Sequence, residues 1–386
     1  MPISEGDFLD AMQTLVFGNS LTSTYKLALI RAIVEIVSES APRANGADLK
    51  ITYDELADAF LRMYWTQGEV YEATSGEQGV LAQNPANSLL ILSLISDFKT
   101  ETARYPEAKT SKTLTWYQAS RLPQYAGLRK NCVQRVLIKN PLTYIKGYEF
   151  LFRNERAAGA VFVTGAVARY VCRFYPFLME LTESRWEAEV RSLKKNEGLL
   201  GDKNGRTLRD FLFHAQERES LEAVRTFMAE KLGEATCFYC GATLRKGASH
   251  ADHFIPFSFY QDTKVFNFVP ACASCNTSKS NFLASGEHVE NWMKRNREKA
   301  EFIIRTCPNQ LDPGTAVTGN RAFTVYQRAD ERKELLWVRR SDKAGIGPYM
   351  GRASQGLISD LRRYAAEMTA LERRLASDTE TAPRIG

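Results

Sequence analysis

The sequence predicts a mostly α-helical α+β protein, and three features of the chain lead to this fold class. Its 386 residues exceed what one hydrophobic core usually serves, so two or three domains are expected. Apolar residues recur with helical spacing near both ends of the chain. Between them lies a short stretch with paired cysteines and strand-like apolar runs. We therefore expect helical N-terminal and C-terminal regions around a small embedded module.

Residues 1–110 are predicted to form a helical domain. In LTSTYKLALIRAIVEIV the apolar side chains fall on one helical face: Leu27, Ile30, Ile33, Val34 and Val37. A second helix should begin at Thr52, because Thr52 and Glu55 have the spacing of a capping box. The strand-like LKIT before it leaves a winged-helix module as the alternative to the favoured plain bundle.

Residues 111–200 are predicted to be helical and are rich in basic and aromatic side chains. The two kinds interleave: Arg121, Arg129, Lys130, Arg135, Lys139 and Lys146 with Trp116, Tyr117, Tyr125 and Tyr144. This mixture suits a surface that follows a phosphate backbone, and equally a solvated helix face. The net charge of +6 is compatible with a polyanionic partner and does not establish one.

Two further helices are expected on either side of the cysteine-containing stretch. After a candidate linker at 192–206, a connecting helix within 201–232 should bury Leu221, Val224, Met228 and Leu232, carry His214 as an ordinary side chain, and end at Gly233. An α/β segment at 301–386 should end in a long helix with a heptad seam of Leu357, Leu361, Tyr364, Met368, Leu371 and Leu375. Packing of this seam within the chain is favoured over a homodimer.

We expect neither a signal peptide nor a membrane-spanning segment. MPISEGDFLD lacks the basic and apolar regions of a signal peptide. The uncharged apolar stretch at 157–168 is too short for a bilayer, which needs about twenty residues. We expect a cytoplasmic protein without a membrane partner, in which clustered cysteines bind metal rather than form disulfides.

Four of the seven cysteines form two pairs, CFYC (Cys237, Cys240) and CASC (Cys272, Cys275). Each Cys-x-x-Cys turn places two thiolates for a tetrahedral zinc ion, and two turns complete a structural Zn²⁺ site. The 31 residues between the pairs exceed the usual ~15–20 of a simple ribbon. Zinc is therefore expected to staple a loop that is too small to fold unaided.

The loop between the cysteine pairs contains HADHFIP, and FNFVPACASCNTSK runs from it into the second pair. Framed by the cysteines, these motifs resemble the HNH endonuclease family, whose core is the ββα-metal fold. The resemblance covers about residues 233–285, and we expect the nuclease domain to occupy 233–300.

The resemblance implies a role for four polar residues. His253 would be the general base, a task that histidine can perform near neutral pH. Asp252 and Asn276 would bind a catalytic Mg²⁺ or Mn²⁺ ion, and the asparagine favours a hard metal over zinc there. Asn267 would fix the hairpin through backbone hydrogen bonds.

Two basic side chains are candidates for contacting the substrate phosphate. Lys279 lies three residues beyond Asn276, so both would face one way on a helix. His250 lies two residues before Asp252, on its strand face, and would bind phosphate or metal or support a ligand. Asp252 and His253 would point to opposite faces of a regular strand, so both reach one phosphate only where the strand bends or ends.

The sequence thus predicts a metal-dependent HNH endonuclease that hydrolyses phosphodiester bonds in DNA. A nuclease domain on a larger scaffold resembles restriction or anti-phage defence effectors, by analogy of architecture. Mobile-element and repair nucleases are alternatives, and so is a non-catalytic zinc module that binds DNA. The expected partners are DNA and either another defence-system subunit or an activating ligand.

Overall fold

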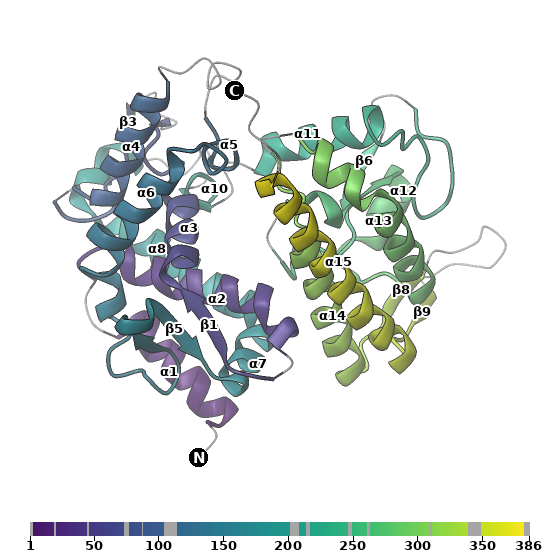
Figure 1. Ribbon diagram of the computed structural model, residues 1–386, viewed down its shortest axis with the longest axis horizontal. Coiled ribbons are helices and arrows are strands. Elements are labelled where there is room, and N and C mark those ends of the chain that lie inside the picture. The colour runs from purple at the N-terminus through teal and green to yellow at the C-terminus, as the bar shows by residue number, and fades with distance from the viewer. Residues whose placement is uncertain are drawn as a thin grey trace. The chain divides into compact units, whose positions relative to one another are not determined.

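The computed structural model describes residues 3–18, 21–44, 46–72, 77–86, 88–103, 114–200, 208–213, 217–245, 249–260, 263–308, 311–338 and 349–381. The chain forms two compact units, Met1–Gln216 and Glu217–Gly386 (Figure 1). Helices dominate both units, and the sheets of the described residues have only two or three strands. The mostly helical α+β class predicted from the sequence is confirmed.

The first unit is built from short and long helices with a three-stranded sheet and a two-stranded sheet among the described residues. In chain order its elements are α1 (Glu5–Phe17), α2 (Tyr25–Ala44), β1 (Leu49–Thr52), α3 (Tyr53–Tyr64), β2 (Tyr71–Glu72), β3 (Gln78–Gly79), α4 (Leu90–Thr102), α5 (Trp116–Ala119), α6 (Tyr125–Asn131), η2 (Cys132–Leu137), η3 (Pro141–Thr143), β4 (Arg153–Glu155), η4 (Arg156–Ala158), β5 (Ala160–Val163), α7 (Gly165–Arg173), α8 (Tyr175–Ser192), η5 (Lys194–Asn196), α9 (Glu197–Leu200) and α10 (Leu208–Phe213). Helix α2 packs against α3, α7 and α8. The whole predicted apolar stripe of α2 is buried, which confirms that helix.

The predicted capping box begins α3. The Thr52 hydroxyl accepts a hydrogen bond from the Glu55 backbone N–H at 3.2 Å, and the Glu55 carboxylate accepts one from the Thr52 N–H at 2.7 Å. Strand β1 pairs antiparallel with β5, beside which it lies in Figure 1, and β5 also pairs antiparallel with β4. This sheet joins segments from both sides of residue 110 within the unit Met1–Gln216. The domain boundaries stay predictions.

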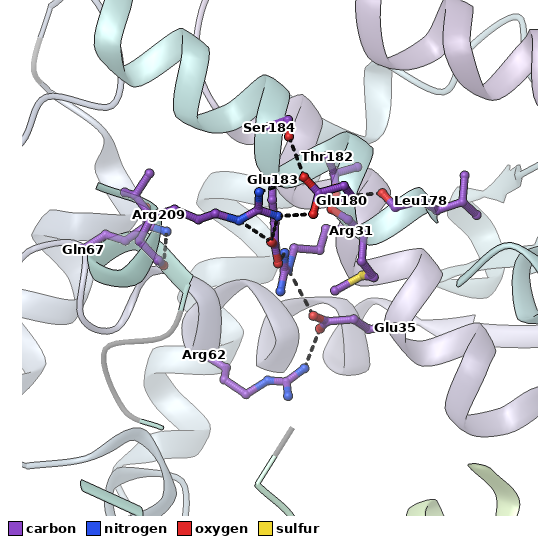
Figure 2. Close-up of polar contacts among 12 residues, drawn as sticks. Arg31, Glu35, Arg62, Gln67, Leu178, Glu180, Thr182, Glu183, Ser184 and Arg209 are labelled. Atoms are coloured by element: carbon purple, nitrogen blue, oxygen red, sulfur yellow. Dashed lines mark hydrogen bonds and ion pairs between the residues drawn. The ribbon is translucent and has the colours of Figure 1, made fainter. Parts of the chain in front are cut away.

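A buried ionic network links four helices of the first unit: α2, α3, α8 and α10 (Figure 2). The Glu183 side chain on α8 is fully buried and accepts hydrogen bonds from Arg31 on α2 and from Arg209 on α10, the latter at 3.1 Å from Nε. Arg31 also pairs with Glu35 at 3.1 Å, and Glu35 with Arg62 at 2.6 Å. A buried carboxylate is tolerated only when charged partners compensate for its lost hydration, as these do.

We expect Glu183→Gln to destabilise the first unit by about 3–5 kcal/mol, because it removes one of the two carboxylates that compensate the buried Arg31 and leaves only Glu35. Burial alone would raise the pKa of Glu183, but Arg31 and Arg209 outweigh it and hold that pKa below its usual value. The carboxylate therefore contributes stability above its unfolded pKa of about 4.3, and this contribution is lost as pH falls through the lower folded value. Urea unfolding at several pH values measures both effects.

The control for this variant is Glu187→Gln, which breaks a more exposed pair with Arg191 on the same helix. It should cost less than about 1 kcal/mol. Equal unfolding midpoints for the two variants would show that the buried network does not stabilise this unit.

The second unit contains two small hairpins and three long helices. Its elements are α11 (Glu217–Glu230), β6 (His250–His253), η6 (Val265–Asn267), β7 (Phe268–Ala271), α12 (Ala273–Lys279), α13 (Gly286–Thr306), α14 (Thr315–Glu331), β8 (Leu336–Val338), β9 (Tyr349–Gly351) and α15 (Gln355–Thr381). Helix α15 runs along α14 and also contacts α13 (Figure 1). Its seam is buried in this packing at Leu357, Leu361, Tyr364, Met368 and Leu375. The seam is used within the chain, which leaves the homodimer without support.

The expected connecting helix consists of α10 and α11 in the described residues. Residues 201–207 and 214–216, with part of the candidate linker and with His214, lie outside the described part of the chain. Helix α11 ends at Glu230, and Gly233 follows it with φ of +63°, a conformation that favours glycine. Across the described helices, none combines the length and the apolar character that spanning a bilayer requires.

Candidate active site

The four paired cysteines converge in the second unit. The sulfur atoms of Cys237, Cys240, Cys272 and Cys275 all lie within 4.8 Å of one another, and those of Cys240 and Cys272 are 3.8 Å apart. A tetrahedral zinc ion with Zn–S bonds of ~2.3 Å would hold two sulfurs about 3.8 Å apart. The cluster therefore has the dimensions of a structural zinc site.

Each cysteine pair is presented by its own local structure. The first pair lies in a tight turn, in which Gly241 donates its N–H to the Cys237 carbonyl at 2.8 Å and adopts φ of +69°. The second pair begins α12, where the Cys272 thiol caps the helix by accepting from the Cys275 N–H at 3.5 Å. Both sulfurs of each pair are thus positioned by backbone geometry within four residues.

A hairpin and a helix carry the predicted catalytic residues. Strand β6 pairs antiparallel with β7, with Asp252 opposite Val269 and His253 opposite Phe268. Helix α12 follows β7 and packs against β6. Strand β6 ends at His253, so the two candidate residues are the last two of the strand, and both are paired with β7.

Asn267 fastens the chain beyond β6. Its side-chain oxygen accepts from the Ile255 N–H at 2.8 Å, and its amide nitrogen donates to the Ile255 carbonyl at 3.0 Å. Its own carbonyl accepts from the Phe254 N–H at 2.7 Å. This is the arrangement that the family resemblance implies for Asn267: it fixes the hairpin through backbone hydrogen bonds.

Asp252 is buried, and two side chains hold one of its carboxylate oxygens. Oδ2 accepts a hydrogen bond from the Tyr239 hydroxyl at 2.5 Å and lies 3.1 Å from Nζ of Lys279. Burial raises the pKa of Asp252, and the charge of Lys279 and the Tyr239 hydroxyl only partly oppose this rise. None of the described contacts involves the other oxygen, Oδ1.

His253 has a buried nitrogen that can accept a proton. Its ring packs against Phe268 and Phe257, with centroids 4.3 and 5.4 Å away. Nε2 is buried and has no hydrogen-bond partner among the described residues. Burial, together with the charge of Lys279, lowers the pKa of His253 from 6.5 to about 4. The imidazole is therefore neutral near pH 7.

The three remaining site residues differ in how accessible they are. Asn276 on α12 is half-buried, and its side chain forms no hydrogen bond with a described residue. His250 is exposed at the start of β6. Lys279, predicted to contact phosphate, is fully buried instead: it pairs with Asp252 and donates to the His253 carbonyl at 2.7 Å. Its burial is explained by the carboxylate, which needs a counter-charge away from water.

Tyr239 is a site residue that the sequence reasoning missed. It stands between the first two cysteines, so only the zinc ligands around it attracted notice. His288 on α13 lies edge-on to the Tyr239 ring at 5.3 Å, and Trp337 on β8 packs against it at 5.2 Å. These rings from distant segments hold the phenol whose hydroxyl bonds Asp252. In the sequence, the only indication of a role for Tyr239 is its position between two cysteines of the cluster.

Two family models match the chain. Residues 6–205, just over half of it, match a domain of unknown function, DUF8808, and residues 237–282 match the HNH endonuclease family. The second match includes both cysteine pairs, the hairpin and α12, which confirms the resemblance found from the sequence. No curated protein and no solved structure matches the chain.

Proposed function

The chain belongs to the DUF8808 family and carries an HNH endonuclease domain after that region, and from this premise we propose that it is a metal-dependent endonuclease that hydrolyses phosphodiester bonds in DNA. The observation that carries the proposal is Nε2 of His253, a buried nitrogen of a neutral imidazole next to Asp252, with no hydrogen-bond partner among the described residues. A purely structural zinc module has no need of such a group.

His253 is the general base in this proposal. Its imidazole takes a proton from the attacking water, whose oxygen bonds to phosphorus as the bond to the 3′-oxygen breaks. The Phe257 and Phe268 rings fix the imidazole. The two hydrogen bonds between the Asn267 side chain and the Ile255 backbone hold the chain just beyond His253, so the base stays at the end of the hairpin.

Asp252 and Asn276 are proposed to hold a Mg²⁺ or Mn²⁺ ion, through oxygens that no described contact uses. Bound there, the ion would neutralise charge on the leaving oxygen. Tyr239 and Lys279 orient Asp252 by holding its other oxygen. The exposed His250 is the proposed phosphate contact on this strand, because Lys279 is occupied by Asp252.

We propose that the protein acts in restriction or anti-phage defence. What supports this is the arrangement of a nuclease domain behind a larger unit of another family, an argument by analogy. The same cleavage assay on different DNA substrates also tests the alternatives. These are activation by a ligand or by a further subunit, and the role of a mobile-element or repair nuclease.

The test is cleavage of a plasmid by purified protein with Mg²⁺, with Mn²⁺ and with neither. Asp252→Ala and Asn276→Ala should each lower cleavage about a hundredfold or more while zinc content stays unchanged, because they remove ligands of a different ion. Asn276→Asp should recover better with Mn²⁺, since it keeps an oxygen at that position. Thr277→Ala, an exposed neighbour on α12, is the matched control.

If the unaltered protein binds DNA but never cuts it with either metal, the zinc module is a binding module and the proposed activity is wrong. If it cuts and both alanine variants cut equally well, the metal ligands are wrongly assigned while the nuclease remains.

A further inference from the structure

The first unit contains a pocket of about 260 Å³ that the nuclease chemistry does not use. Its apolar side is formed by Ile138, Leu142 and Ile145 together with the buried ring of Tyr53. Pockets for drug-sized ligands measure ~300–1,000 Å³ and combine an apolar lining with a few polar groups. The smaller volume suits a ligand of about the size of one nucleotide.

Two cations stand at the polar side of this pocket. Lys146 and Arg156 are exposed, and neither forms an ion pair or a side-chain hydrogen bond with a described residue. Their neighbour Arg153 differs, because it pairs with Glu155 and lies 4.9 Å over the Phe162 ring. Two exposed cations beside an apolar pocket, of which Lys146 also interacts electrostatically with Glu149, favour a ligand that carries a phosphate.

The pocket also presents a fixed amide and a fixed carboxylate. The Tyr53 hydroxyl donates to Oδ1 of Asn154 at 2.6 Å, which leaves the Asn154 amide nitrogen without a described partner. The Glu149 carboxylate accepts the N–H of Gly147 at 2.9 Å. Recognition of the hydrogen-bonding edge of an extruded base requires a hydrogen-bond donor and an acceptor beside an apolar surface. Asn154 and Glu149 are the donor and the acceptor in this pocket.

An aromatic side chain next to the pocket favours a polymer over a free nucleotide. Phe150 is 53% exposed, and its ring lies 6.2 Å from that of Tyr148. It follows Glu149 directly, so it is available to stack on a base beside the one in the pocket.

We propose that this pocket binds one unpaired nucleotide of a DNA strand, with the base against the apolar side and its phosphate at Lys146 and Arg156. The proposal rests on DNA being the substrate of the nuclease. It gives the first unit the task of selecting DNA that contains an unpaired or extruded nucleotide.

Binding by the full chain carrying His253→Ala, in which we expect cleavage to be at least about a hundredfold slower, tests this. Fluorescence anisotropy compares a duplex with one unpaired nucleotide, the same duplex fully paired, and nucleoside monophosphates as competitors. Adding Lys146→Ala and Arg156→Ala should weaken binding of the first duplex about tenfold or more and lower the slope of log K against log salt by about two. Removing two other exposed charges of this unit, with Arg191→Ala and Lys194→Ala, should change that affinity less than about threefold.

A second variant reports on the base itself. Glu149→Gln should change which unpaired base binds best and leave the affinity for the fully paired duplex unchanged, because only an extruded base reaches the carboxylate. The proposal is overturned if the Lys146 and Arg156 variant binds both duplexes like its parent, or if free nucleotides bind and DNA does not compete with them.

Cleavage by protein with His253 intact separates the two proposals. If the protein cuts the plasmid and the pocket variants bind DNA as before, only the proposal for the pocket is refuted. Selective binding of the unpaired nucleotide by a protein that never cuts DNA refutes the nuclease alone.

Discussion

His253→Ala should lower the single-turnover rate of DNA cleavage about a hundred- to ten-thousand-fold, the usual contribution of a positioned general base. The variant keeps Asp252 and Asn276, so DNA binding without divalent metal should be unchanged. Single-turnover cleavage of one plasmid, beside a binding assay, measures both quantities.

Two other variants separate catalysis from support of the hairpin. Asn267→Ala removes both hydrogen bonds to the Ile255 backbone, so stability should fall together with the rate. His250→Ala at its exposed position should weaken substrate binding and leave folding unchanged. Near-normal cutting by His253→Ala would remove the proposed mechanism.

Cys237→Ser should unfold much of the second unit, the largest structural effect that we expect. Structural zinc contributes an apparent ~10–16 kcal/mol, comparable with the ~5–15 kcal/mol that stabilises a whole domain. Elemental analysis should find about one zinc per chain in the unaltered protein and much less in the variant. Thermal unfolding followed by circular dichroism should show the loss of one transition.

The matched control is Cys307→Ser in the same unit, whose thiol lies outside the cluster and faces the Leu311 carbonyl at 3.8 Å. Its zinc content and its unfolding should stay close to those of the unaltered protein. A zinc-free protein with both transitions and full activity would contradict the zinc assignment.

The candidate site could be located from the sequence because its metal-binding and catalytic residues lie only a few positions apart in short motifs. Two Cys-x-x-Cys pairs predict a metal cluster without knowledge of the fold, and the four sulfurs do converge. The position of Lys279 beside Asn276 on a helix was equally predictable, but its environment was not. Whether its ammonium faces substrate or Asp252 depends on how α12 packs on β6.

By itself the sequence determined the helical character of the chain, the start of α3 at Thr52, the apolar seam of α15 and the two cysteine pairs of the metal-binding cluster, since each depends on residues a few positions apart. Only the tertiary structure decided which distant segments meet. It paired β1 with β5 and buried Glu183 between Arg31 and Arg209. It also brought Tyr239 to Asp252, and Tyr53 to Asn154. Such contacts follow from how the whole chain packs its apolar faces and compensates its buried charges, and no local pattern encodes that balance.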